Sequence, residues 1–122
     1  MSKGSVKYWN AFAEQSRNRW KSLAGTDGMI EQITLGRDPD CGDLTRLTRF
    51  KAGADTTPFG SSCHQYPEEV FVVSGRLYDQ ACERWLEQGD YACRQPGEIH
   101  GPFLCEQECI VLEISSPGRI KA

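Results

Sequence analysis

The chain has 122 residues, the length of about one domain, and its apolar fraction of 39% and charged fraction of 25% are ordinary for a globular protein. The net charge of −3 lacks the surplus of Lys and Arg that nucleic-acid and anionic-membrane partners require, so we expect neither kind of partner. No apolar run approaches the roughly 20 residues of a membrane span, and the N-terminus MSKGSVKYWN lacks the apolar region of a secretory signal, so a cytoplasmic location is expected.

Residues 1–28 are predicted to form an extension that packs on the main domain or on a partner subunit. Within residues 5–23, large apolar side chains recur at loosely helical intervals: Tyr8, Trp9, Phe12, Trp20 and Leu23. This spacing fits a short helix and an edge strand equally well. Gly25 and the pair Asp27-Gly28 then mark the end of the extension.

Residues 29–122 are predicted to form one all-β domain. Short runs with the composition of strands are MIEQITL (29–35), LTRLTRF (44–50), EVFVVSGRLY (69–78), ERWLEQ (83–88), DYACR (90–94) and CIVLEI (109–114). The segments between them are rich in Gly, Pro, Asp and Ser, and short strands at this spacing are typical of a β-sandwich or barrel. EVFVVS and CIVLEI are apolar on both strand faces, so we expect both faces to be covered.

Six cysteines would suit the disulfide framework of a small secreted domain, but this chain has no secretory signal and no CxxC pair. We therefore expect free thiols in a reducing compartment, most of them buried as small apolar side chains. The six are Cys41, Cys63, Cys82, Cys93, Cys105 and Cys109. A redox role is the weakest functional hypothesis, and it requires an accessible thiol with a low pKa.

The candidate site begins with the two histidines of the chain, His64 and His100. If the backbone around His64 is extended, residues 62, 64 and 66 share one face, and Cys63 points the other way into the core. Tyr66 shares the face of His64 and is the candidate catalytic residue, as a proton or hydrogen-bond donor, with packing as its alternative role.

Glu68 and Glu69 open the most apolar strand of the chain, where a carboxylate is costly to bury unless it is paired or bound to a metal. Two imidazoles and one carboxylate are the ligands of a facial-triad centre, which leaves coordination positions for a substrate or dioxygen. The candidate metal ligands are therefore His64, His100 and one of the two glutamates, Glu68 or Glu69. From these residues alone, the alternative to metal binding is that each of them has a purely structural role.

Other residues could line or charge a pocket. Aromatic candidates for an apolar wall, or else for the core, are Trp85, Tyr91 and Phe103. Arginines that could bind a substrate carboxylate, or else lie on the surface, are Arg49, Arg76 and Arg94. In LTRLTRF, Arg46 and Arg49 face opposite ways on a strand, so only one of them can enter a pocket.

The segment from Gly53 onward resembles the first of the two sequence motifs of the cupin superfamily. This motif has a glycine, a His-x-His pair, a glutamate and a second glycine. The spacing of His64, Glu68 and Gly75 matches it. Ser62 stands where cupins have their first histidine.

The segment from Gly89 to Leu104 resembles the second cupin motif. Gly89, Gly97 and His100 match its fixed positions. Pro96 lies one residue after the usual proline position, and Leu104 replaces the usual asparagine. The wider stretch 29–114 resembles the small single-domain cupins akin to the anti-sigma-factor and acetylacetone-cleaving groups.

This resemblance implies an all-β cupin fold, a double-stranded β-helix or jelly-roll barrel with a pocket inside it. Cupins of this kind usually hold one divalent metal ion through three histidines and one glutamate. Position by position, this chain offers His64, Glu68 and His100 and lacks an imidazole at Ser62. The metal could be Fe, Zn, Ni or Mn, since imidazole and carboxylate suit all of them.

The implied function is that of a metal-binding cupin acting on a small molecule, as a dioxygenase-like enzyme or a lyase. The alternative is a non-catalytic cupin that binds or senses a ligand with a degenerate metal site, which Ser62 and Leu104 favour. A homodimer is expected because exposed barrel edges are often covered by a partner, and the aromatic N-terminal segment is the candidate to cross between subunits.

Overall fold

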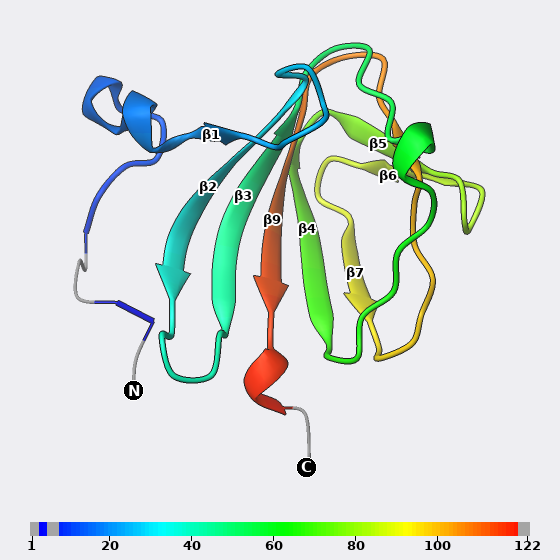
Figure 1. Cartoon of the computed structure of the whole chain (residues 1–122). Coiled ribbons are helices and arrows are strands. Elements are labelled where there is room, and N and C mark those ends of the chain that lie inside the picture. The colour runs from blue at the N-terminus through cyan, green and yellow to red at the C-terminus, as the bar shows by residue number, and fades with distance from the viewer. Residues whose placement is uncertain (1–2, 5–7, 120–122) are drawn as a thin grey trace.

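Two antiparallel sheets face each other in the computed structural model, which describes residues 3–4 and 8–119 (Figure 1). The larger sheet has the strand order β1-β2-β3-β9-β4-β7. Its strands are β1 (Lys21–Ser22), β2 (Ile30–Arg37), β3 (Leu44–Phe50), β9 (Cys109–Ser115), β4 (Glu68–Ser74) and β7 (Tyr91–Arg94). The smaller sheet has the order β6-β5-β8, formed by β5 (Arg76–Asp79), β6 (Arg84–Glu87) and β8 (Phe103–Leu104).

The helical elements of the described residues are short 3-10 turns: η1 (Glu14–Arg19), η2 (Thr57–Phe59) and η3 (Pro117–Arg119). None of them is long and apolar enough to cross a membrane. The expected all-β class is confirmed, and two facing antiparallel sheets are the arrangement of a jelly roll. The N-terminal segment contains both elements that its spacing allowed, since η1 is followed directly by the edge strand β1.

The predicted strands are confirmed, and one of them is divided in two. EVFVVSGRLY is split at Gly75, where β4 of the larger sheet ends and β5 of the smaller sheet follows. Gly75 has a φ of 75°, and a Cβ atom there would clash with the carbonyl oxygen of Glu108. Glycine is therefore required at the point where the chain passes from the larger sheet to the smaller one, because any side chain there would clash.

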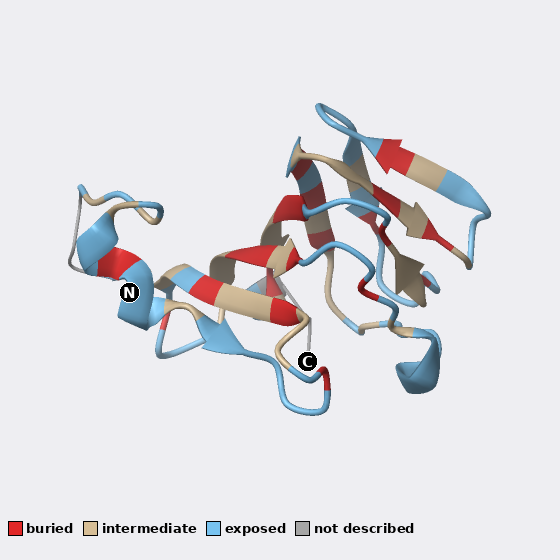
Figure 2. Ribbon diagram, turned by 90° about the horizontal axis from the view of Figure 1, so that it is seen from above, coloured by how far each residue is buried: buried red, intermediate tan, exposed pale blue. Residues whose placement is uncertain are grey.

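Inward-pointing side chains of the two sheets meet in an apolar core, and Figure 2 shows the buried segments on both. Val70, Val72 and Val111 come from the larger sheet, and Leu77 and Leu86 come from the smaller one. Strand residues alternate between faces, so these valines and leucines turn toward each other while their neighbours turn outward. The same inner face of the larger sheet becomes polar further along, where it borders a cavity.

The outer face of the larger sheet is only partly covered. Ile33, Leu47 and Ile110, on β2, β3 and β9, are buried beneath N-terminal residues that include Trp9, Ala11 and Trp20. On β4, by contrast, Phe71 and Val73 are 41% and 36% exposed. CIVLEI is thus covered on both faces, but the same expectation for EVFVVS is wrong, because the N-terminal segment does not reach over β4. The domain boundary at residue 28 stays a prediction.

All six cysteines are free, as expected. The expectation that most of them are buried is wrong, since only Cys105 and Cys109 are buried. The exposed cysteines are Cys41, Cys63, Cys82 and Cys93. Composition could not reveal this, because it does not say which cysteines fall in loops or, like Cys93 on β7, on the exposed face of a strand.

Trp20 anchors the N-terminal segment to the sheet. Its indole nitrogen donates a hydrogen bond of 2.9 Å to the Ala11 carbonyl, and the Arg49 guanidinium lies 4.1 Å from its ring centroid. Trp20→Ala is expected to lower the free energy of unfolding by about 2 kcal/mol, because apolar burial, a hydrogen bond and a cation–π contact are lost together. Urea denaturation measures the loss. The control is Tyr8→Ala, since Tyr8 is 92% exposed, and equal losses in both variants would contradict this role of Trp20.

Candidate metal centre

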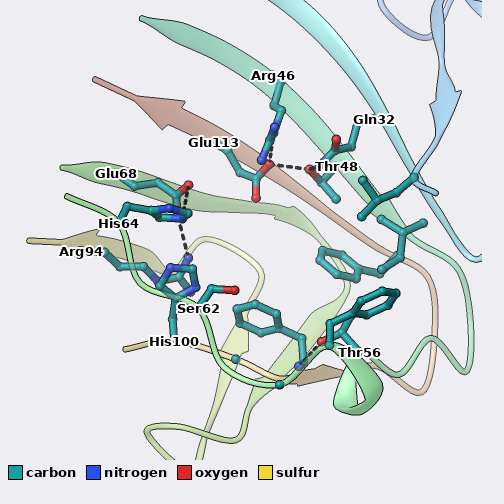
Figure 3. Close-up of a pocket in the computed structure, with 17 residues that line it drawn as sticks. Gln32, Arg46, Thr48, Thr56, Ser62, His64, Glu68, Arg94, His100 and Glu113 are labelled. Atoms are coloured by element: carbon teal, nitrogen blue, oxygen red, sulfur yellow. Dashed lines mark hydrogen bonds and ion pairs between the residues drawn. The ribbon is translucent and has the colours of Figure 1, made fainter. Parts of the chain in front are cut away.

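A cavity of about 220 Å³ lies between the inner face of the larger sheet and two rim segments, residues 56–64 and 100–103 (Figure 3). This volume is below the roughly 300–1,000 Å³ that is usual for ligand pockets. Side chains of β2, β3, β4, β7 and β9 line its sheet side, and both histidines line its rim side. A cavity of this size suits a small molecule.

Two cross-strand ion pairs form the polar end of the sheet side. Glu68 on β4 lies directly opposite Arg94 on β7, and Arg94 Nη1 donates to Glu68 Oε1 at 3.2 Å. Arg46 on β3 lies directly opposite Glu113 on β9, and Arg46 Nε donates to Glu113 Oε1 at 2.7 Å. Thr48 also donates to this oxygen of Glu113. Pairing of this kind lowers the cost of placing four charges in a partly buried cavity.

The histidines reach the cavity from the rim and not from the sheets. Ser62 and His100 form an isolated β-bridge in which each backbone N–H donates to the other's carbonyl, at 2.8 and 2.9 Å. Residues paired in this way turn their side chains to the same face, so Ser62 lies beside His100, as Figure 3 shows. Ser62 and His64 both line the cavity, in agreement with the face predicted for them.

The segment that carries His64 differs from the expected strand. Apart from the bridge at Ser62, residues 61–66 form no strand, and Cys63 is exposed. The assignment of Cys63 to the core is therefore wrong. The bridge at Ser62 and hydrogen bonds from the Gly97 N–H to the His64 carbonyl and from the Ser61 hydroxyl to the Gly101 carbonyl hold this segment along the rim. Its side away from the cavity, which includes Cys63, meets solvent.

The structure brings the three candidate metal ligands together. The ligand atoms of His64, Glu68 and His100 all lie within 4.8 Å of one another. His64 Nε2 is 3.8 Å from Glu68 Oε2, and the two imidazole centroids are 5.1 Å apart. Small side-chain rotations would bring all three groups to the roughly 2.1 Å at which imidazole and carboxylate bind a divalent metal. Their role as ligands stays a prediction.

His100 supplies the observation that a metal ion would explain. The residue is 7% exposed, and both of its ring nitrogens are buried without a hydrogen-bond partner among the residues that the structure describes. Burial, helped by the positive charge of Arg94 and by His64, lowers the pKa of His100 to about 4. The imidazole is therefore neutral at pH 7, which is the form that binds a metal, and an ion would satisfy a nitrogen that is otherwise costly to bury. The residues fit a metal ion.

Glu68 is held in place by its neighbours. Its Oε1 accepts the hydrogen bond from Arg94, while Oε2 accepts one of 3.4 Å from the Ser115 hydroxyl and faces His64. Arg94 in turn lies 3.6 Å from Asp79 Oδ2, so it is shared between two carboxylates. One oxygen of Glu68 is thus tied to a guanidinium, and the other is turned toward the two histidines.

Sequence reasoning missed part of this site. The surface position favoured for Arg94 is wrong, since Arg94 is 8% exposed and lines the cavity. Arg46 lines the cavity while Arg49 packs on Trp20, which confirms that only one arginine of LTRLTRF turns inward. Glu113 was not considered, although a single charged residue inside the apolar run CIVLEI was a signal for a buried, paired carboxylate.

The remaining candidates occupy different surroundings. Tyr66 stacks on His64 with ring centroids 4.8 Å apart and is absent from the cavity lining within the described residues, so its catalytic role stays a prediction. Phe103 lines the cavity, whereas Trp85 packs on Tyr78 in the smaller sheet. Tyr91 is 58% exposed and donates a hydrogen bond to Glu69, away from the cavity.

The low pKa of His100 predicts a specific pH dependence of the metal-free protein. The unfolded chain takes up a proton at His100 near pH 6.5, whereas the folded chain takes it up only near pH 4. Stability is unaffected above about pH 6.5 and falls as the pH drops toward 4, because the unfolded state binds more protons in this window. Between pH 7 and pH 5 we expect a loss of about 2 kcal/mol that the variant His100→Gln does not show. Urea titrations in the presence of a chelator measure it, and identical losses in both proteins would contradict the assignment.

Two facing antiparallel sheets, with a His–Glu–His cluster in the cavity beside them, define a cupin. Among solved structures, the chain is similar to an RmlC-like cupin from Shewanella frigidimarina, at 19% identity over 98% of this chain and 96% of that one, with a TM-score of 0.73. It is also similar to an acetylacetone dioxygenase from Acinetobacter johnsonii, at 18% identity over 93% and 76%, with a TM-score of 0.71. These likenesses establish the fold.

The chain belongs to the ChrR cupin-like domain family, whose sequence model matches residues 10–117. The solved complex of SigE with the anti-sigma factor ChrR from Rhodobacter sphaeroides contains a similar fold, at 22% identity over 80% of this chain and 49% of that chain, with a TM-score of 0.61. A search of curated proteins found no match. The resemblance noted in the sequence is thereby confirmed.

Proposed function

We propose that the chain binds one divalent metal ion through His64, Glu68 and His100 and uses it on a small molecule in the adjoining cavity. The observation that carries this proposal is His100, whose two buried nitrogens lie beside His64 and Glu68 and have no hydrogen-bond partner in the described part of the chain. The test is metal content by inductively coupled plasma mass spectrometry, on untagged protein and after reconstitution with Fe, Zn, Ni or Mn. Near-stoichiometric uptake of one of these supports the proposal, and uptake of none overturns it.

The metal would supply Lewis-acid chemistry or dioxygen binding, according to its identity. The residues of the chain have the supporting roles. Arg94 and Ser115 fix the Glu68 carboxylate so that Oε2 faces the histidines. Ser62 puts a short neutral side chain where cupins have another imidazole, so a coordination position stays open toward the cavity.

An enzyme is the first form of this proposal. It is supported by the acetylacetone dioxygenase among the similar folds and by the adjoining cavity. An oxygen electrode tests it, with iron-loaded protein and small oxygenated compounds such as β-diketones. Oxygen uptake that requires both metal and compound supports a dioxygenase, and release of a cleavage product without oxygen uptake supports a lyase.

A non-catalytic binding or sensing module is the second candidate. It is supported by the serine at position 62 and by the similarity to the chain solved in complex with SigE. Thermal-shift screening against small metabolites, with and without chelator, separates the two candidates. Stabilisation that a chelator leaves unchanged supports the sensing module, and stabilisation that requires metal supports the first proposal.

A homodimer completes the proposal. The exposed apolar residues Phe71, Val73 and Tyr91 lie on β4 and β7, at the uncovered part of the larger sheet. Covering them would remove apolar surface from water, which favours association. Light scattering tests the assembly, and a monomeric mass at micromolar concentration would contradict the homodimer. The cytoplasmic location stays a prediction.

A further inference from the structure

The cavity has two ends of different chemistry. On the inner face of the larger sheet, the rows Glu68–Arg94 and Arg46–Glu113 lie toward one end, while Ile30 pairs with Phe50 toward the other. Phe103 connects the two ends. Its ring centroid is 6.2 Å from that of Phe50, 6.0 Å from that of His100 and 5.5 Å from the Arg94 guanidinium carbon.

The apolar end is completed from the rim. Leu23 and Phe59 line the cavity and are 42% and 54% exposed. They lie on the loop after β1 and on η2, so they border the opening of the cavity and not its floor. A ligand that fills the cavity would thus meet charges and imidazoles with one end and aromatic or aliphatic side chains with the other.

The charges at the polar end nearly cancel, and a metal ion would change their sign. The guanidinium of Arg46 pairs with the carboxylate of Glu113, and that of Arg94 pairs with the carboxylates of Glu68 and Asp79. These two cations and three anions leave a net charge of minus one. Histidines that bind a metal are neutral, so a divalent ion would bring the net charge of the site to plus one. A single negative charge on a ligand would then neutralise it.

The two arginines differ in how far they can serve a ligand. Arg94 is shared between Glu68 and Asp79, and its side chain is 10% exposed. Among the described residues, Arg46 has one carboxylate partner, Glu113, which it contacts through Nε; Arg46 lines the cavity and its side chain is 28% exposed. A guanidinium carries more N–H donors than one carboxylate can accept. Arg46 is therefore the cation that can still receive an anionic group.

We propose that the metal-loaded cavity selects a small monocarboxylate with an apolar body, and that Arg46 is the specificity-determining residue for its carboxylate. The carboxylate lies between the metal and Arg46, and the hydrocarbon or aryl body lies along Phe103 toward Phe50. Arginine suits this role because its planar fork matches a carboxylate. This inference rests on the proposed metal site and adds the class of ligand.

The test is isothermal titration calorimetry on zinc-loaded protein after dialysis. The probes are butanoate, benzoate and 3-phenylpropanoate, each compared with its neutral amide, and acetate serves as a carboxylate without an apolar body. We expect at least one of the three acids to bind about tenfold more tightly than both its amide and acetate, a difference of about 1.4 kcal/mol. Addition of a chelator should abolish the preference for the acid.

Two arginine variants assign the effect. Arg46→Gln should retain zinc and lower the affinity for the preferred acid about tenfold while leaving the weak affinity for the amide unchanged. Arg49→Gln is the matched control, because Arg49 lies on the same strand and faces Trp20 on the other side of the sheet. Equal loss in both variants, or no loss in Arg46→Gln, overturns the role of Arg46.

The outcomes separate this inference from the function on which it rests. Protein that takes up zinc but binds no acid more tightly than the amide overturns the inference and leaves the metal site standing. Protein that takes up no zinc, iron, nickel or manganese overturns both. Metal-dependent preference for an acid, lost in Arg46→Gln alone, supports both.

Discussion

The double variant His64→Ala/His100→Ala is expected to lose metal binding altogether. The two imidazoles are the only histidines of the chain, and their ligand atoms lie within 4.8 Å of one another and of Glu68. Removing both leaves a single carboxylate, so the affinity should fall by more than the roughly 10–100-fold that loss of an outer-shell partner costs. Metal content and calorimetric titration of wild type and variant measure the effect.

Adjacent carboxylates provide the matched control for this experiment. Glu68→Gln should weaken metal binding strongly, whereas Glu69→Gln should leave it unchanged, because Glu69 contacts Tyr91 on the opposite face of β4. Thermal unfolding without metal verifies that each variant is folded. Full metal occupancy in the folded double variant would show that the ion is bound elsewhere.

Ser62→His is expected to strengthen metal binding by about 100-fold, which corresponds to about 2.7 kcal/mol. Ser62 lines the cavity and pairs with His100 across the isolated bridge, so an imidazole there would point to the face that carries the other histidines. A further neutral nitrogen ligand suits every metal considered for this site. Competition titration with a metal indicator measures the gain.

The control for this variant is one residue away. Ser61→His introduces the same side chain at a position outside the cavity lining of the described residues, where the serine hydroxyl bonds the Gly101 carbonyl. It should leave the metal affinity unchanged. Equal gains in both variants would mean that the added histidine binds metal at the surface, and no gain at Ser62→His would place the metal away from the bridge.

Much of the architecture could be predicted because strand patterns are local. β3 coincides with LTRLTRF, and the resemblance to the first cupin motif favoured Glu68 over Glu69 through its spacing to Gly75. Glu68 is indeed buried in the cavity wall, and Glu69 lies on the other face. Alternation along a strand fixes which residues share a face, and this information is present in the sequence alone.

The parts that could not be predicted depend on what covers each face. Phe71 on β4 looks like a core residue, but it is exposed because the N-terminal segment packs over β2, β3 and β9 instead. Arg94 looks like a surface residue, but Glu68 lies directly opposite it on β4, and the ion pair between them lowers the desolvation cost of burying the guanidinium. Both outcomes follow from contacts between segments that are distant in sequence.

The isolated bridge between Ser62 and His100 has a mechanical consequence. It joins two rim segments that are far apart in the chain, and within the described residues no regular strand reinforces it there. An ion held by His64 and His100 would add a side-chain link to the bridge and to the hydrogen bond that the Gly97 N–H donates to the His64 carbonyl. At a free metal concentration of 100 times the dissociation constant, such binding would add about 2.7 kcal/mol to the free energy of unfolding. Resistance of the rim to proteases would then report metal occupancy without any assay of activity.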